Sequence, residues 1–246
     1  DTTPISSDGA ARMIATIAGE IKGHDVLVLS DYAKGTLTDS VLQQSIALAR
    51  EAGIPVVVDP KSTSLHRYRG ATVLTPNSRE IAAATGLPPA LSDADTVEAA
   101  LLGMEQAASQ AMLVTRAEKG ITLSQRGKDP VHIAGDEREV FDVAGAGDTV
   151  VAALALARAA GYDLEDAARI ANIAAGIAVG RPGTSTVSQS DLLLEMARRN
   201  GNIAANVLNM AELQSRLETW KREGLIVGFT NGCFDLLHIG HITLLE

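Results

Sequence analysis

Four short apolar runs, each separated from the next by a stretch with helical periodicity or a loop, constrain the fold of this chain most strongly. The runs lie at residues 25–30, 54–59, 71–75 and 111–115. Uninterrupted apolar runs of this length are typical of strands that are covered on both faces. Strands that alternate with helices indicate an α/β fold, in which a mostly parallel sheet carries helices on both faces.

The remaining periodic segments complete this prediction. Residues 121–125 and 130–134 alternate weakly and are expected to form antiparallel edge strands, and 225–230 reads as a further buried strand. Thr38 is a suitable N-cap, and Gly53 suits the end of the helix that follows it. Helices are predicted at residues 8–22, 38–50, 78–85, 93–109, after Gly147, and at 164–179, 189–199 and 211–223.

An Asn- and Gly-rich stretch at residues 200–210 is the best candidate for a linker. We therefore expect a first domain over 1–199 and the start of a second domain over 211–246. The sequence lacks an initiator Met and stops within an apolar pattern, so both ends are expected to be cut from a longer chain.

The charge and composition exclude several classes of protein. The net charge of −9 gives no reason to expect nucleic-acid binding. No stretch has the apolar length of a membrane span, and no signal peptide is evident. A single cysteine, Cys233, rules out an internal disulfide and suits a reducing cytoplasm.

Residues 142–149, Asp-Val-Ala-Gly-Ala-Gly-Asp-Thr, come directly before an apolar helical run. Gly145 and Gly147 permit a tight turn that feeds a helix N-terminus, where unpaired N–H groups attract phosphate. Asp148 would place a carboxylate beside that anion, where it could accept a proton from an attacking hydroxyl. The alternative is a simple Gly-rich turn in which Asp148 caps the helix.

Ligands of open parallel sheets bind at the carboxyl ends of the strands, so polar groups that follow a predicted strand are candidate site residues. Asp31 and Lys34 follow the first strand and could hold a sugar hydroxyl or a phosphate. Lys61 follows the second strand and could neutralise a phosphate. The alternatives are a polar turn for the first pair and a surface lysine for Lys61.

The third strand leads into Asn77, Ser78, Arg79 and Glu80 at the start of a predicted helix. Asn77 and Glu80 lie three residues apart and would face the same way. They could hold water and Mg²⁺ beside nucleotide phosphates, because Mg²⁺ prefers oxygen ligands and retains several waters. A capping box, with an Asn cap and a reciprocating Glu, explains the same spacing.

These segments resemble the motifs of the ribokinase-like (PfkB) carbohydrate kinases. The resemblance implies a ribokinase-like fold, ATP and Mg²⁺ as cofactors, an anion hole at Gly145, Ala146 and Gly147, and Asp148 as catalytic base. The Asn77–Glu80 segment is similar to the Asn-x-x-Glu motif, which in that family organises the metal and the phosphates.

The same resemblance implies further contacts with the nucleotide. Thr115 and Gly120 correspond to a segment that lies along the nucleotide, although Arg116-Ala117 departs from the small residue and glycine of many members. Asn172 resembles a position that lines the adenine pocket; its alternative is a helix-surface amide. Asp142 and the loop 181–186 resemble the parts that hold a monovalent cation such as K⁺ in some members.

Residues 229–241, Phe-Thr-Asn-Gly-Cys-Phe-Asp-Leu-Leu-His-Ile-Gly-His, form the second sharp motif. His238 and His241 could stabilise charge on nucleotide phosphates. A partial metal site or two structural histidines are the alternatives. The string resembles the start of cytidylyltransferase-like nucleotidyltransferases, which implies a Rossmann-like second domain.

The order of the two modules resembles the family of bifunctional ADP-heptose synthesis enzymes of Gram-negative bacteria. The resemblance implies ATP-dependent phosphorylation of D-glycero-D-manno-heptose 7-phosphate at its 1-hydroxyl. It also implies adenylyl transfer to the product, which gives ADP-heptose for the lipopolysaccharide core, and a homodimer. Two alternatives stay open: another sugar-phosphate kinase of the same fold, or a non-catalytic nucleotide-binding module.

Overall fold

The computed structural model describes residues 2–88, 92–135, 143–181, 183–199, 210–222 and 224–228. The chain divides into two compact units, at residues 1–196 and 197–246. The first unit contains the whole sheet and the helices that pack on it. In the second unit the described part is mainly one helix, so the expected boundaries at 199 and 210 and the second domain stay predictions.

A six-stranded sheet in the order β1-β2-β3-β4-β5-β6 is the centre of the first unit. β1 to β4 pair in parallel, and β5 pairs antiparallel with both β4 and β6, which confirms the predicted pairing. Both final strands were predicted at an edge, but of the two only β6 is an edge strand of this sheet. The strands are β1 (Leu27–Ser30), β2 (Val56–Asp59), β3 (Val73–Leu74), β4 (Ala111–Thr115), β5 (Ile121–Gln125) and β6 (Val131–Ile133).

The helices lie close to the predicted segments. Thr38 caps the second helix by accepting a hydrogen bond from the N–H of Val41, as the sequence predicted. The helices are α1 (Ser7–Glu20), α2 (Asp39–Glu51), α3 (Ser78–Thr85), α4 (Asp93–Ala107), α5 (Ala146–Ala159), α6 (Leu164–Val179), α7 (Gln189–Arg199) and α8 (Met210–Arg222), with 3₁₀ turns η1 (Ile21–Gly23), η2 (Leu65–Tyr68) and η3 (Ala117–Lys119).

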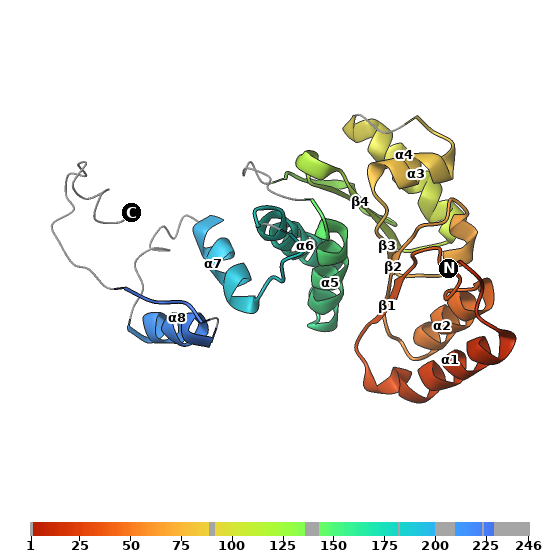
Figure 1. Cartoon of the computed structure of the whole chain (residues 1–246). Helices are drawn as coiled ribbons and strands as arrows, with labels where there is room; N and C mark the ends of the chain where they lie inside the picture. The colour runs from red at the N-terminus through yellow and green to blue at the C-terminus, as the bar shows by residue number, and fades with distance from the viewer. Residues whose placement is uncertain are drawn as a thin grey trace. The chain divides into compact units, whose positions relative to one another are not determined.

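Alternate residues of the central strands enter two separate hydrophobic cores. On β2, Val56 and Val58 pack with the α2 and α4 side, whereas Val57 packs with α5 and α6. Figure 1 shows α1–α4 on one side of the strands and α5 and α6 on the other. The sheet is therefore the middle layer of three, which explains why its central strands are apolar on both faces.

Two strand predictions were wrong in part. The run at 25–30 was expected to be covered on both faces, but β1 is an edge strand and Val28 is 40% exposed. The segment 225–228 has no regular structure, although a strand was predicted there, and Ile226 is fully exposed. An apolar run forms a ladder only where a partner strand supplies hydrogen bonds, and no other segment of the described second unit is a strand.

No described helix is both long enough and apolar enough to span a lipid bilayer.

Candidate active site

A pocket of about 220 Å³ lies at the carboxyl ends of the parallel strands. Residues after β1, β2, β3 and β4 meet the start of α5 there. Its lining consists of Tyr32, Asp59, Lys61, Thr75, Asn77, Glu80, Thr115, Gly147 and Asp148. The pocket thus joins five segments of the sequence, as expected for a parallel sheet.

The Gly-rich turn has the predicted form. Gly145 is the N-cap of α5 and adopts φ of +78°, a left-handed conformation that favours glycine. Gly147 and Asp148 follow in the first turn, where backbone N–H groups lack acceptors within the helix. The exposed Asp148 carboxylate accepts a 3.0 Å hydrogen bond at Oδ1 from the hydroxyl of Tyr32. The turn therefore presents a carboxylate, and N–H groups without acceptors in the helix, to the pocket.

The Asn77–Glu80 pair forms the capping box that its spacing allows. Asn77 Oδ1 accepts hydrogen bonds from the N–H groups of Arg79 and Glu80, and Glu80 Oε2 accepts one from the N–H of Asn77. This is a complete capping box. Both residues also line the pocket, and Glu80 Oε1 lies 2.5 Å from Lys61 Nζ. The cap therefore fixes both side chains at the pocket wall, and their role in holding water and Mg²⁺ stays a prediction.

Asp59 is a pocket carboxylate that the sequence did not single out. Burial raises its pKa from 3.8 to about 6, the charge of Lys61 opposes this rise, and the charges of Glu80 and Asp148 add to it. The side chain is buried, and the main-chain oxygen accepts from the N–H of Asp31. A signal was available in its position at the end of the second strand, directly before Pro60-Lys61.

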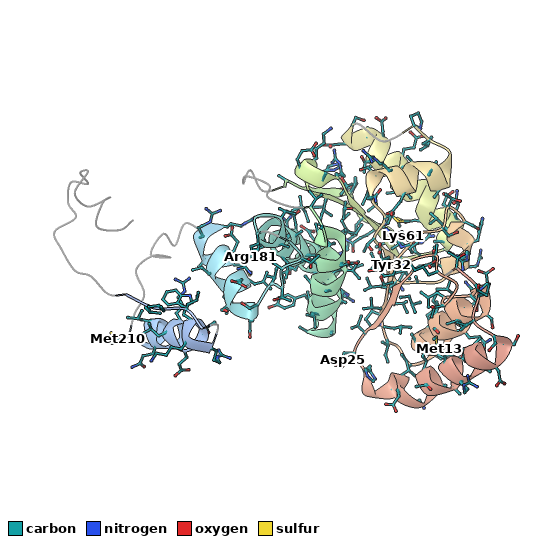
Figure 2. All side chains as sticks on the ribbon, in the orientation of Figure 1. Met13, Asp25, Tyr32, Lys61, Arg181 and Met210 are labelled. Atoms are coloured by element: carbon teal, nitrogen blue, oxygen red, sulfur yellow. The ribbon has the colours of Figure 1, made fainter. Side chains whose placement is uncertain are left out.

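Lys61 is the cation of this acidic pocket. Burial by itself would lower the pKa of Lys61, but the hydrogen bond to Glu80 and the charges of Asp59 and Asp148 outweigh it and raise the pKa. Lys61 and Tyr32 are labelled close together in Figure 2, and both line the pocket. Lys61 therefore carries a firm positive charge among three carboxylates, which suits the contact with phosphate predicted for it.

Asp31 is buried and does not line the pocket of Asp148. Its Oδ2 accepts a 2.6 Å hydrogen bond from the hydroxyl of Tyr68 and lies 3.4 Å from Arg67, while Oδ1 accepts from the N–H of Ala33. Lys34 is exposed beside a second cavity of about 490 Å³. Tyr32 lines both cavities, and Asp31 lines the second one with Lys34.

Several other predicted contact residues lie outside the pocket of Asp148. Ser78 donates to the main-chain oxygen of Thr115, which does line the pocket, and Arg79 is exposed. Gly120 has φ of +82°, and a Cβ there would lie 2.1 Å from the main-chain oxygen of Ile133. Local contacts explain Ser78 and Gly120 but not the exposed Arg79, and the predicted contacts of all three with nucleotide stay predictions.

Asn172 is buried in α6 rather than lying on a helix surface. Its amide nitrogen donates a 2.8 Å hydrogen bond to the main-chain oxygen of Ala134, just after β6. The predicted contact with adenine is untested by this arrangement. Three further predicted site residues, Asp142, His238 and His241, lie outside the described residues.

Comparison with known proteins agrees with this geometry. The model of the pfkB family carbohydrate kinases matches residues 5–191. The chain belongs to the pfkB family of carbohydrate kinases. The match spans the six strands, the pocket and α5 and α6 of this pfkB kinase, and the ribokinase-like α/β fold predicted from the sequence is confirmed.

Curated relatives of this pfkB kinase carry the name "Bifunctional protein HldE". The protein from Gluconacetobacter diazotrophicus is 47% identical over 98% of this chain and 50% of its own length. Those from Pelobacter propionicus and Geobacter sulfurreducens are 46% and 45% identical over 99% and 98% of this chain. The chain spans about half the length of the curated relatives that it matches.

Solved structures show the same fold at lower identity. Arabidopsis thaliana ribokinase complexed with ribose and ATP has a TM-score of 0.65 and 24% identity, over 78% of this chain and 60% of its own. Phosphofructokinase-2 from Escherichia coli in complex with potassium has a TM-score of 0.69 and 20% identity, over 79% of this chain and 63% of its own.

Proposed function

We propose that this pfkB kinase transfers the terminal phosphoryl group of ATP to the 1-hydroxyl of D-glycero-D-manno-heptose 7-phosphate. The observation that carries the proposal is the single pocket in which Asp148, at the start of α5, meets Asn77, Glu80 and Lys61. The name of the relatives, together with the resemblance to ADP-heptose synthesis enzymes, supports the choice of sugar.

In the proposed reaction, Asp148 accepts the proton of the sugar 1-hydroxyl as its oxygen attacks the terminal phosphorus. A new oxygen–phosphorus bond forms, the bond to the bridging oxygen of ADP breaks, and the proton stays on the carboxylate. N–H groups of the Gly145–Gly147 turn would stabilise charge on the transferring group. Positioning and electrostatics supply most of the acceleration in phosphoryl transfer.

The donors at the pocket fit Mg²⁺. They are oxygen atoms of Asn77 and Glu80, and Asp59 lines the same pocket. Mg²⁺ in proteins binds few protein oxygens and retains several waters. The described residues contain no group of three or more His, Cys, Asp or Glu side chains that could hold a metal by themselves. Bound Mg²⁺ would neutralise phosphate charge, and Lys61 would add a second positive charge on the same side.

We extend the proposal to the longer protein, in which an adenylyltransferase domain would convert the sugar 1-phosphate to ADP-heptose for the lipopolysaccharide core. His238 and His241 would contact its nucleotide. A homodimer, a K⁺ ion near Asp142 and a cytoplasmic location also belong to this proposal; their support is the family resemblance described above.

Replacing Asp148 with Asn tests the assignment of the base. We expect loss of kinase turnover by a factor of about 10² or more, with binding of Mg–ATP retained in calorimetry, because the amide keeps the shape and cannot accept the proton. Binding without turnover in the unmodified protein would instead support a nucleotide-binding module. Turnover of the Asp148→Asn variant at the unmodified rate would refute the role of the carboxylate.

A panel of sugar phosphates tests the acceptor. We expect the highest kcat/KM for D-glycero-D-manno-heptose 7-phosphate among heptose, hexose and pentose phosphates. A higher kcat/KM for a hexose phosphate would transfer the assignment to another sugar kinase of this fold while leaving the role of Asp148 intact.

A further inference from the structure

Tyr32 contacts the proposed base directly, although 116 residues separate the two in sequence. Its hydroxyl donates a 3.0 Å hydrogen bond to Oδ1 of Asp148. The side chain is 54% exposed, so the contact forms at the pocket surface and not in the core. Among the described residues, Tyr32 is the hydrogen-bond donor to the Asp148 side chain. No described residue donates to Oδ2 of this carboxylate.

The backbone around Tyr32 is held in one conformation by buried polar contacts. Ala33 adopts φ of +53°, which is unfavourable for a residue with a Cβ, and its N–H donates a 2.8 Å hydrogen bond to Oδ1 of Asp31. Asp31 is itself 3% exposed and accepts from the hydroxyl of Tyr68. An unfavourable conformation persists only where the surroundings enforce it. The backbone that carries Tyr32 is therefore held in a fixed conformation.

The far end of the loop is anchored as well. The guanidinium of Arg67 donates to the main-chain oxygen of Leu37 and to the carboxylate of Asp39, and it also approaches Asp31. Gly35 packs so closely on the N-terminal segment that a Cβ would lie 2.4 Å from the main-chain oxygen of Thr3. Both sides of Tyr32 are thus fixed, and the hydroxyl reaches Asp148 without ordering a mobile loop.

We propose that Tyr32 is a positioning residue for the transfer step, which rests on the proposed role of Asp148 as base. Its hydroxyl fixes the orientation of the Asp148 carboxylate through Oδ1, so that Oδ2 accepts the proton of the sugar hydroxyl. The tyrosine ring lines both cavities and forms part of the wall beside Lys34. Hydroxyl and ring therefore have separable effects, the first on the chemical step and the second on the acceptor.

The test compares Tyr32→Phe with Tyr162→Phe. Tyr162 is also half-exposed but lies after the C-terminal end of α5, away from both cavities. We expect Tyr32→Phe to lower kcat about 10-fold, which corresponds to about 1.4 kcal/mol for a hydrogen bond to a charged acceptor. KM for the sugar phosphate and the Tm should stay within error, because the ring remains. Tyr162→Phe should match the unmodified protein in all three quantities.

The possible outcomes separate this inference from the proposed function. If Asp148→Asn is inactive but Tyr32→Phe keeps the unmodified kcat, the role of Tyr32 is overturned and the base assignment stands. A Tyr32→Phe defect that lies wholly in KM, or that accompanies a lower Tm, also overturns it. If Asp148→Asn turns over normally, the proposed function itself falls.

Discussion

Replacing Asp59 with Asn would remove a carboxylate whose charged form is costly in the folded protein. Burial is the main reason that its pKa rises from 3.8 to about 6, and Lys61 offsets the effect only in part. The folded state therefore binds this proton more tightly than the unfolded state. The stabilisation that protonation provides is complete below about pH 4 and is lost as the pH rises through about 6.

The size of the effect follows from the shift. Raising the pKa from 3.8 to about 6 corresponds to about 3 kcal/mol between the two protonation states of Asp59. This value is an upper limit, because the charges of Lys61 and Asp59 interact and their titrations are coupled. We therefore expect the free energy of unfolding of the unmodified protein to fall by about 1–3 kcal/mol between pH 4 and pH 7, relative to that of Asp59→Asn.

Urea unfolding in metal-free buffer at several pH values from 4 to 8 would measure this difference. Asp129→Asn is the matched control, because Asp129 is an exposed aspartate in the turn between β5 and β6. Its pH dependence should follow that of the unmodified protein. Parallel curves for Asp59→Asn and the unmodified protein would refute the reasoning, since they would mean that burial does not penalise this charge.

Two further predictions concern groups that support the site. Tyr68→Phe should lower the free energy of unfolding by about 2 kcal/mol in urea titrations, because the buried Asp31 would lose its hydroxyl donor; an unchanged midpoint would contradict this. Gly120→Ala should lower Tm and cost more than about 1 kcal/mol, since its Cβ would meet the main-chain oxygen of Ile133. Gly127→Ala, at a positive φ in an open turn, is the control for conformation without the clash.

Local signals were sufficient where an element contains its own start and stop. The helix predicted at 78–85 is α3, with those bounds, because Asn77 and Glu80 cap its start and Gly86 adopts the left-handed conformation at its end. The edge position of β1 was not predictable in this way. Its apolar run resembles that of the central β2, and exposure depends on which strands lie beside it.

Some residues of the candidate site were predictable from local sequence, and others depended on contacts with distant segments. The strand-end rule identified Lys61, Asn77 and Glu80, the Gly-rich motif identified Asp148, and the family resemblance added Thr115; all five line one pocket. The same rule also gave Asp31, which lies outside this pocket: its carboxylate accepts from the Tyr68 hydroxyl, and the residue lines the second cavity with Lys34. A residue's place at a strand end is set by the chain, but the direction of its side chain is set by neighbours from other segments.

The sequence by itself determined the order of strands and helices and the end of the sheet at which polar groups gather, because apolar periodicity and capping residues act over a few positions. Only the tertiary structure decided that the Tyr32 hydroxyl contacts Asp148 and that the pKa of Asp59 is raised. Both depend on groups far apart in the chain, since a hydrogen bond requires a distance of about 3 Å and a pKa sums all nearby charges and burial.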